Sequence, residues 1–472
     1  MSDMSRAQRI HQAAMEIMRE VGVTFHNDEA CRILKENGIR VEGHVAYFTE
    51  EQVMHWVHMA PAQFTLYGRS EQYRLTLGDG STNPAPTYGC AFIAERDGTQ
   101  RPGTIADYVK ALKLVHASEI YQLNGGILIQ PGDIPDTLAP LAMFYAAVTH
   151  SDKALLLPTA DKAVMEAMLQ AACHLFGGRE ALAEKPRMIA LINTNSPLAL
   201  DGKMLDNLML MARYGQPVIV CPAAMLGATG PLFMAGTVAM GAAESLAGIV
   251  LAQMIRPGTP CVFGIQSTAV DMHGLTFACA APEGTLMQGF SADLGRFYHL
   301  PSRGGGSQCD APCVNAQAGY ESMLTYYSAV QHGISLVMEA GGVVASVNAT
   351  SFDKMIVDFE IIRQVQFASQ PFAVDADTLC LDEIKAVGHG GSYVTTDTTL
   401  DNFMELYMPR IGSRDAKSPS YFEDSIDREC KRLLDVYEDS RPALDPAVRD
   451  AVRAVCAEAG LTVQQMDEIE AL

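Results

Sequence analysis

Short apolar runs alternate with helical patterns from about Tyr121 onward, and this alternation limits the possible folds more than any other feature. Continuous apolar runs are typical of strands in a parallel sheet that is covered on both faces. Seven units of this kind predict an α/β protein, and a (β/α)8 TIM barrel is the simplest way to close the sheet. The expected strands are Gln122–Ile129, Ala154–Leu157, Met188–Ile192, Val218–Cys221, Cys261–Ile265, Tyr298–Pro301 and Ile334–Met338. The expected helices are Pro135–Val148, Lys162–Phe176, Gly202–Tyr214, Ala235–Ile255, Glu283–Phe297 and Asn315–Gln331.

The eighth strand has the weakest signal. Its candidate is Phe372–Leu381, which the glycine-rich loop Gly388–Tyr393 follows. Residues 1–120 are expected to form N-terminal helices and a small antiparallel β element packed on the barrel. Residues 121–408 are then the catalytic barrel, and residues 409–472 form a C-terminal helical extension.

Charge and cysteine usage narrow the class of protein. There are 34 Lys and Arg against 55 Asp and Glu, a net charge of −21, with no basic cluster. Nucleic acid and anionic membrane surfaces would therefore be repelled. Eleven cysteines lie scattered without framework spacing, which is typical of reduced thiols in a cytoplasm. The polar N-terminus lacks a signal-peptide pattern, and the most apolar run, Val238–Met254, contains Glu244 and Gln253, so we expect a soluble protein.

Three consecutive glycines, Gly304–Gly306, interrupt an apolar segment just after Arg303. Such density suits a backbone at positive φ or one that another molecule approaches closely. We expect a strand end whose loop is built for contact, with Ser307, Gln308 and Asp310 as nearby polar groups. A tight structural turn is the alternative.

The carboxyl ends of the expected strands would meet at one mouth of a barrel. The residues there are amides, hydroxyls, small residues, one arginine and one or two carboxylates. A Ser–His nucleophile pattern such as GxSxG is missing, which argues against a hydrolase. These end residues are Gln130, Pro158, Thr159, Asn193, Asn195, Ser196, Pro222, Met225, Gln266, Ser267, Arg303, Glu339, Gly341 and Gly342.

Three further patterns have plain structural alternatives. Cys309 and Cys313 could bind zinc, but the second ligand pair is missing, so we favour core or loop thiols and no metal. Asp271-Met272-His273 resembles the start of a cobalamin-binding DxHxxG motif, yet Thr276 stands where glycine is needed. Several aromatic residues could face a cationic ligand, although each alone is more often core: Tyr88, Phe92, Tyr320, Tyr326, Tyr327 and Tyr393.

The order of motifs resembles the trimethylamine methyltransferase family, in particular its members without pyrrolysine. The similarity begins with IHQAAMEIMREVGVTFHNDEACRILKENGI, YGRSEQYRLTLGDG and RPGTIADYVKALKL. It continues through NTNSPLALD, AMGAAESLAGIVLAQMIRPGTP and GGGSQCDAPCVNAQAGYE. The resemblance implies a TIM barrel that passes a methyl group from an amine to Co(I) of a separate corrinoid protein. Without pyrrolysine it implies a quaternary amine, such as glycine betaine, proline betaine or carnitine, rather than trimethylamine.

A betaine carries a cation and a carboxylate, and its leaving group is a neutral tertiary amine that needs no general acid. We therefore name binding residues and no acid–base catalyst. For the cation we expect Tyr88, Tyr320, Glu339 and Tyr393, and for the carboxylate Asn193, Asn195, Gln266, Arg303 and His389. For the approach of the corrinoid we expect Gly304, Gly305, Gly306, Ser307 and Asp310.

Structural roles compete with these assignments: Glu339 as a loop cap, Arg303 paired with Asp310, and His389 bonded to backbone carbonyls. Two other functional classes also stay open. One is a zinc-dependent barrel methyltransferase that uses Cys309 and Cys313, and the other is a non-catalytic betaine-binding protein. We expect a homo-oligomer whose partners are a corrinoid protein and a small amine.

Overall fold

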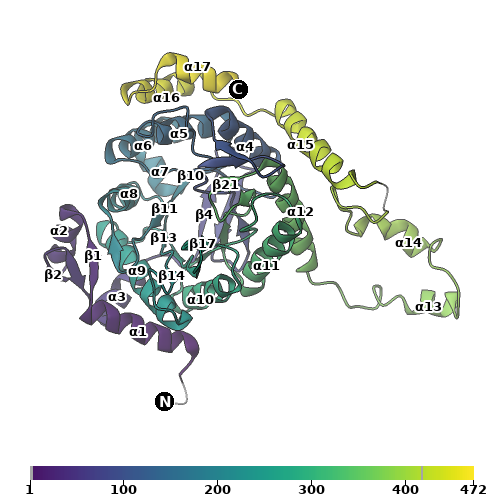
Figure 1. The fold of residues 1–472 in the computed structure, drawn as a ribbon, viewed down its shortest axis with the longest axis horizontal. Coiled ribbons are helices and arrows are strands. Elements are labelled where there is room, and N and C mark those ends of the chain that lie inside the picture. The colour runs from purple at the N-terminus through teal and green to yellow at the C-terminus, as the bar shows by residue number, and fades with distance from the viewer. Residues whose placement is uncertain (1–3, 416–417) are drawn as a thin grey trace.

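The computed structural model describes residues 4–415 and 418–472. Within them, the centre is an eight-stranded sheet with neighbours in the order β6-β19-β18-β15-β13-β11-β10-β9, and every neighbouring pair is parallel. Helices surround the strands on the outside (Figure 1). The predicted α/β class is therefore confirmed. The strands are β6 (Asn83–Pro84), β9 (Leu123–Gly125), β10 (Ala154–Leu157), β11 (Met188–Asn193), β13 (Val218–Cys221), β15 (Cys261–Gly264), β18 (Ser302–Gly305) and β19 (Leu336–Met338).

The helices that follow these strands alternate with them as the apolar pattern predicts. The longest is α9 (Met234–Ile255), which is long and apolar enough to cross a membrane, but 94% of its most apolar window is buried inside the fold. It packs against α1, α3 and α8, so it is a core helix. The others of the ring are α4 (Ile105–Ala117), α5 (Ala139–His150), α6 (Lys162–Phe176), α7 (Arg179–Glu184), α8 (Gly202–Arg213), α10 (Pro282–Tyr298), α11 (Ala316–His332) and α12 (Phe352–Ala368).

The strand predicted at Tyr298–Pro301 is wrong, because α10 continues through Tyr298 and the strand begins at Ser302. Gly304 and Gly305 therefore lie in a buried strand rather than in a loop, and their φ angles are outside the left-handed region. Close packing explains the glycines. A Cβ on Gly305 would stand 2.5 Å from Gln266 Nε2, and one on Gly306 would stand 2.5 Å from Val337 Cγ1.

The eighth strand is also misplaced in the prediction. Phe372–Leu381 forms turns and irregular backbone up to the first residue of a helix. The eighth strand is instead β6, from the N-terminal region, where Asn83 N donates to Ser335 O at 3.0 Å and Ala85 N donates to Val337 O at 2.7 Å. Pro84 stands between these donors, so its missing N–H costs the ladder nothing. Two residues carry no strand periodicity, which explains the error.

The N-terminal region adds helices, a small sheet and a hairpin. One mixed sheet has the order β12-β1-β3-β2, and β4 pairs with β5 in an antiparallel hairpin. Helix α1 of the N-terminal region packs along α9 and α10. These elements are α1 (Arg6–Glu20), β1 (Val23–Phe25), α2 (Asp28–Glu36), β2 (Arg40–Glu42), β3 (Val45–Tyr47), α3 (Glu50–Val57), β4 (Phe64–Tyr67), β5 (Arg74–Leu77) and β12 (Ala199–Leu200).

Two further small sheets stand beyond the carboxyl ends of the central strands, because their strands directly follow β13, β15 and β19. One has the order β14-β16-β17 and the other β20-β21-β7-β8. Together they narrow the entrance to the centre of the fold. Their members are β7 (Phe92–Ala94), β8 (Gln100–Pro102), β14 (Met225–Leu226), β16 (Thr268–Asp271), β17 (Thr276–Ala278), β20 (Val343–Val344) and β21 (Ala349–Thr350).

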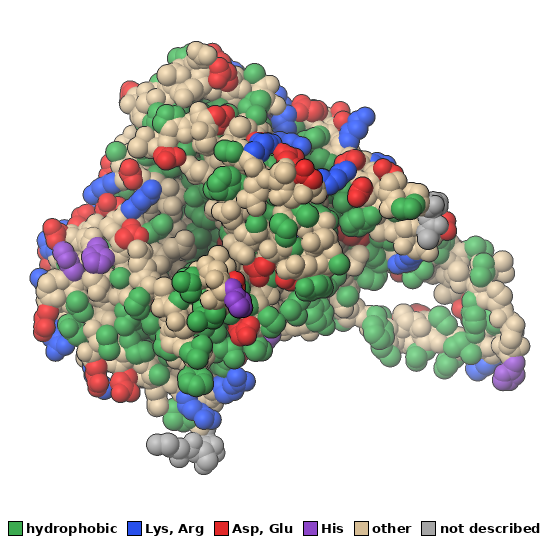
Figure 2. Space-filling view, in the orientation of Figure 1, with side chains coloured by type: hydrophobic (Ala, Val, Ile, Leu, Met, Phe, Trp, Pro, Cys, Tyr) green, Lys and Arg blue, Asp and Glu red, His purple; other side chains and the backbone are tan. Residues whose placement is uncertain are grey.

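After α12 the chain leaves the body and returns at α15 (Tyr421–Asp439). We call residues 369–408 the arm. It contains α13 (Leu381–Val387), α14 (Asp397–Asn402) and the 3-10 helix η1 (Phe403–Glu405), and it projects from the body with hydrophobic side chains along it (Figure 2). Beyond it, α15 packs on α4 and α12, while α16 (Pro446–Glu458) packs on α6 and α17 (Val463–Ala471) packs on α5.

Candidate active site

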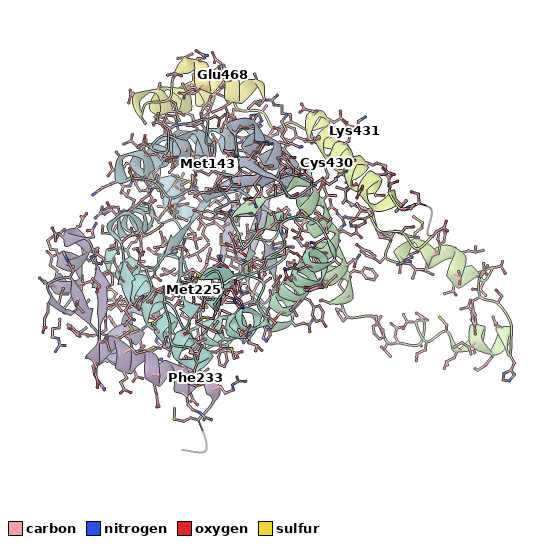
Figure 3. The ribbon with its side chains drawn as sticks, in the orientation of Figure 1. Met143, Met225, Phe233, Cys430, Lys431 and Glu468 are labelled. Carbon is pink, nitrogen blue, oxygen red and sulfur yellow. The ribbon has the colours of Figure 1, made fainter. Side chains whose placement is uncertain are left out.

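A cavity of about 430 Å³ lies at the carboxyl ends of the central strands. Figure 3 shows Met225, just after β13, over the middle of the helix ring, whereas Phe233 lies at its edge beside α1. A larger groove of about 530 Å³ lies at that edge, but the central cavity adjoins a buried ion pair at the ends of parallel strands, so it is the candidate site. The cavity is lined by Tyr88, Gly89, Ile127, Thr159, Leu191, Asn193, Ala223, Gln266, Phe277, Arg303, Gln308, Glu339, Ser346 and Val347.

A buried ion pair dominates the cavity wall. Arg303 on β18 and Glu339, directly after the neighbouring β19, are 2% and 5% exposed. Arg303 Nη2 donates to Glu339 Oε1 at 2.5 Å and to Oε2 at 2.7 Å. Such a charge-assisted contact fixes the two side chains relative to each other. The prediction placed them at opposite ends of a substrate, and the structure instead bonds them together.

Two glutamines extend this pair into a network. Gln266 accepts from Arg303 Nη1, and Gln266 Nε2 donates to Gln308 Oε1 at 3.1 Å. Gln308 Nε2 in turn donates to Glu339 Oε2 at 3.3 Å. Arg303 Nε is a buried donor with no partner among the described residues. The cavity wall therefore keeps one unused N–H on a residue that lines it.

Backbone geometry and burial both mark Glu339. Its φ of 56° is in the left-handed region, which is unfavourable for a side chain of this size and is typical of functional sites. Burial raises the pKa of Glu339, and the charge and hydrogen bonds of Arg303 oppose that shift. The contact of Arg303 Nη2 with both carboxylate oxygens indicates that the pair is ionised.

Two aromatic rings complete the wall. Tyr88 lies in the loop after β6, and Phe277 belongs to β17 of the small sheet over the entrance. Burial raises the pKa of Tyr88 to about 12, so its hydroxyl stays protonated at neutral pH. The two rings offer apolar faces of the kind that attract cations.

Glu244 positions the loop that follows β11. This buried carboxylate on α9 accepts from Ser196 Oγ at 2.8 Å, from Leu198 N at 2.8 Å and from the Thr194 hydroxyl. The loop begins directly after Asn193, whose position in the cavity wall depends on where that loop lies. A charged residue in the most apolar helix thus has a structural reason to be there.

Five of the nine residues predicted to bind substrate line the cavity: Tyr88, Asn193, Gln266, Arg303 and Glu339. The other four are placed elsewhere. Asn195 is exposed on the loop beyond β11, and Tyr320 is exposed on α11. His389 and Tyr393 lie on the arm, because the segment predicted to hold an eighth strand projects from the body. The structure also excludes Asp310 as the partner of Arg303.

The predicted loop for corrinoid approach has a different character. Gly304, Gly305, Gly306 and Ser307 are buried. Asp310 accepts from Cys279 N at 3.0 Å and from Ser346 Oγ at 2.7 Å, which ties neighbouring loops together. These residues lie behind the lining of the central cavity and support it.

Of the other nine lining residues, four are polar or aromatic and were not predicted to bind substrate: Thr159, Phe277, Gln308 and Ser346. Thr159 and Gln308 carried a usable signal, since both stand beside expected strand ends. Phe277 and Ser346 come from strands and turns beyond the carboxyl ends of the central strands, where apolar periodicity is too short to place them.

Within residues 4–415 and 418–472, no group of three or more His, Cys, Asp or Glu side chains is arranged to hold a metal ion. The Cys309 thiol is buried and donates to Val343 O at 3.2 Å. The Asp271 carboxylate accepts from the backbone N of His273 and of Gly274, as in an ordinary turn.

The comparisons with known proteins place this chain in a class of methyltransferases. The family described as trimethylamine methyltransferase (MTTB) matches residues 1–459, and the chain belongs to this family. The solved structure of the Methanosarcina barkeri monomethylamine methyltransferase is similar with a TM-score of 0.55, at 11% identity over 91% of this chain and 87% of that one. That likeness shows the fold alone.

Curated relatives are similar over most of their length. A glycine betaine methyltransferase of Desulfitobacterium hafniense (strain Y51) is 37% identical over 464 residues, or 97% of this chain and 96% of the relative. A proline betaine:corrinoid methyltransferase of Eubacterium limosum is 28% identical over 88% of both chains. A trimethylamine methyltransferase of Methanosarcina barkeri is 29% identical over 83% of this chain and 80% of its own.

Proposed function

We propose that this protein demethylates a quaternary amine of the betaine type and passes the methyl group to a separate corrinoid protein. The observation that carries the proposal is a cavity that joins a buried ion pair to two aromatic faces, in a chain similar along nearly its whole length to a glycine betaine methyltransferase. A zwitterion matches such a wall, because both its charges find a partner there.

The two charges of the substrate lie opposite those of the ion pair, with the cation next to Glu339 and the carboxylate next to Arg303. In glycine betaine one methylene separates the cation from the carboxylate, so both charges reach neighbouring groups of the wall. The ammonium sits against Glu339, Tyr88 and Phe277, and the carboxylate accepts from the unpartnered Arg303 Nε–H. Asn193 and Gln266 supply further amide groups. Arg303 Nη2 is taken by Glu339 and Nη1 by Gln266, so the substrate carboxylate takes the remaining donor, Nε.

The pairing of Glu339 with Arg303 suits loss of a methyl group. The positive charge on nitrogen disappears as the C–N bond breaks, so an isolated carboxylate would favour the bound substrate over the transition state and slow the reaction. A carboxylate already neutralised by Arg303 holds the cation less strongly. When bound, the corrinoid supplies the methyl acceptor. The residues of this chain orient the substrate and exclude water.

We also propose that the central sheet closes as a TIM barrel, to which β6 adds the eighth strand. The N-terminal region and α15–α17 pack on a core that begins at about residue 121 and ends with α12, and the arm lies outside that core. Gly89 N donates to Ile127 O at 2.7 Å and Gln130 N donates to Cys90 O at 2.8 Å. These bonds join the segments that follow β6 and β9, the two ends of the sheet. Eleven free cysteines support a cytoplasmic location.

The test supplies purified protein with a reduced corrinoid protein and one amine at a time, and follows the spectrum of the methylated corrinoid. We expect turnover with at least one of glycine betaine, proline betaine and carnitine, and none with trimethylamine. Equal turnover of trimethylamine would contradict the proposal. Betaine binding by calorimetry without turnover would instead indicate a binding protein, and loss of activity with a chelator would indicate a zinc enzyme.

A further inference from the structure

We propose that the arm, residues 369–408, docks on a second copy of this chain, in the groove between α1, α10 and the start of α9. The proposal concerns assembly and stands apart from the reaction in the central cavity. It rests on an arm that lacks a core of its own and on a groove of matching character.

The arm cannot be stable by itself. Its helices α13 and α14 have seven and six residues, and neither contains a buried residue. Isolated helices shorter than about 12 residues are marginal in water, and most helical stability in proteins comes from packing an apolar face. At the end of the arm Tyr407 donates to Glu360 Oε1 on α12 at 2.5 Å. The helices α13 and α14 hold a defined conformation with no residue buried within the chain, which indicates that their packing is supplied from outside.

The arm also displays an apolar face. Leu400 on α14 and Phe403 and Met404 on η1, the 3-10 helix that directly continues it, are all exposed, Met404 by 70%. Hydrophobic side chains continue along the arm in Figure 2. Exposed apolar surface of this extent marks an interaction site. The exposed set is Phe372, Val374, Leu379, Leu381, Ile384, Tyr393, Val394, Leu400, Phe403, Met404, Leu406 and Met408.

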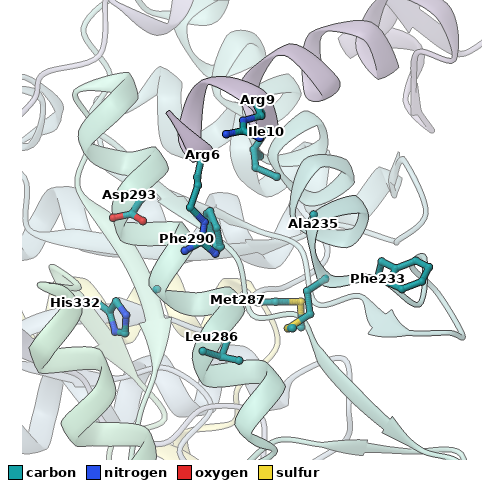
Figure 4. A pocket seen from close by; sticks show the side chains of 12 residues that line it. Arg6, Arg9, Ile10, Phe233, Ala235, Leu286, Met287, Phe290, Asp293 and His332 are labelled. Carbon is teal, nitrogen blue, oxygen red and sulfur yellow. The ribbon is translucent and has the colours of Figure 1, made fainter. Parts of the chain in front are cut away.

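The groove offers the complementary surface. It measures about 530 Å³, and apolar side chains from α1, α10 and the residues before α9 line it (Figure 4). Phe233 at its edge is 83% exposed, and Leu286 is exposed beside it. Arg6 Cζ lies 4.7 Å from the centre of the Phe290 ring, and Arg9 stands nearby on the same helix. The groove is thus apolar at its floor, with Arg6 and Arg9 on one side, and the carboxylate in its lining, Asp293, is paired with Arg296.

Charge favours this match. The arm carries seven carboxylates against one lysine, Lys385, whereas Arg6 and Arg9 rim the groove. Two copies of a chain with net charge −21 repel each other over most of their surface. A cationic rim therefore selects this groove for an acidic arm.

A second copy fits the arm better than a corrinoid carrier does. A carrier has to leave after each methyl transfer, and transient interfaces are smaller and more polar than permanent ones. The apolar side chains of the arm need permanent cover. In Figure 1 the arm projects on the side of α12 and α15, away from α1, so arm and groove of one copy do not meet. An exchange between copies brings them together.

The first experiment measures mass by sedimentation equilibrium. We expect the native protein at a multiple of 50.9 kDa, and both an arm variant (Leu400→Asp, Phe403→Asp, Met404→Asp) and a groove variant (Phe233→Asp, Leu286→Asp) at 50.9 kDa. The control Val463→Asp changes an equally exposed residue of α17 and should keep the native mass. Circular dichroism checks that each variant is folded, as expected for changes at exposed positions.

The second experiment mixes the arm variant with the groove variant. Each mixed pair has one intact arm and one intact groove, so the larger species should partly return, while neither variant alone forms it. A native protein at 50.9 kDa, variants that keep the native mass, or a mixture that stays monomeric would each overturn the proposal. An arm variant of native mass that reacts with free cobalamin but not with the corrinoid protein would overturn it too, and would assign the arm to the carrier.

Discussion

Arg303–Glu339 and Lys354–Asp358 are both buried ion pairs, and they differ in what surrounds them. Arg303 and Glu339 line the central cavity, and one donor, Arg303 Nε, has no partner among the described residues. Lys354 and Asp358 lie one turn apart on α12 and are 0% exposed. One pair faces a space that a ligand can fill, and the other faces only protein.

The Lys354–Asp358 pair holds the backbone behind the cavity. Lys354 Nζ donates to both carboxylate oxygens of Asp358, at 2.5 and 2.6 Å, and to Ser307 O at 3.1 Å. Asp358 Oδ2 accepts from Gly342 N at 2.7 Å. Ser307 follows β18 and Gly342 follows β19, so this pair fixes the segments that carry Arg303 and Glu339. Its hydrogen bonds are used within the fold, and it needs no ligand.

The comparison teaches that burial and charge alone do not identify a binding group. Both pairs are desolvated and lie in the same region of the fold. What separates them is an adjoining cavity together with an unused donor. Substitutions that act differently on stability and on substrate binding test this distinction.

The largest effect is expected from Lys354→Met. It leaves the Asp358 carboxylate buried without a counter-charge, which should lower the free energy of unfolding by about 3–5 kcal/mol. Urea denaturation measures this. The double variant Lys354→Met, Asp358→Leu removes both charges and should lose less than the single variant. If Lys354→Met is as stable as the native protein, the interpretation that this pair stabilises the fold is wrong.

Arg303→Ala should affect binding most. Losing the charge-assisted contacts should raise KM for a betaine about 100-fold, since such bonds contribute roughly 1.5–3 kcal/mol. Arg303→Lys should recover only part, because lysine lacks the planar fork. Steady-state kinetics with a betaine and with choline, which has no carboxylate, separate the roles. Equal losses on both substrates would show that Arg303 acts only through Glu339.

The sequence predicted the strands correctly where the local apolar pattern was strong. Ala154–Leu157 and Val218–Cys221 agree with β10 and β13 because a strand covered on both faces reads as a continuous apolar run. The strand β6 was not predicted, because it has only two residues, one of them proline, and so shows no strand periodicity. Its place depends on tertiary pairing with β19.

The sequence identified only part of the site, again because tertiary pairing decides where the other residues lie. Arg303 and Glu339 both stand at strand ends, which was enough to select them. Their mutual contact depends on the register of β18, and the prediction placed that strand four residues too early, at Tyr298–Pro301. His389 and Tyr393 were selected on the assumption of an eighth β/α unit at Phe372–Leu381, and that assumption was wrong.

A pH profile sharpens the role of Glu339. Burial raises the pKa of its carboxyl above the ordinary glutamate value of 4.5, so it gains a proton at higher pH than an exposed glutamate would. Protonation removes the charge that faces the substrate cation, and affinity for a betaine should therefore fall as pH falls through that raised pKa. In Glu339→Gln the affinity should be about tenfold lower at neutral pH and insensitive to acid. Calorimetric titrations from pH 8 down to the limit of folding measure both, and an unchanged acid limb in the variant would assign the pH dependence to another group.

The smallest effect is expected from Tyr88→Phe. The Tyr88 hydroxyl stands 3.5 Å from Leu157 O, the outer limit of a hydrogen bond, and its pKa of about 12 keeps it protonated across the working pH range. Its contribution to the cavity is therefore the ring face, which phenylalanine retains, and kcat/KM should stay within about threefold of the native value. Tyr88→Leu keeps apolar bulk but removes the ring, and should lower kcat/KM about tenfold for every quaternary amine that reacts, choline included. Steady-state kinetics on both variants check this. A Tyr88→Phe variant as impaired as Tyr88→Leu would show that the hydroxyl contacts the substrate, and the cation would then have to be placed nearer to Phe277.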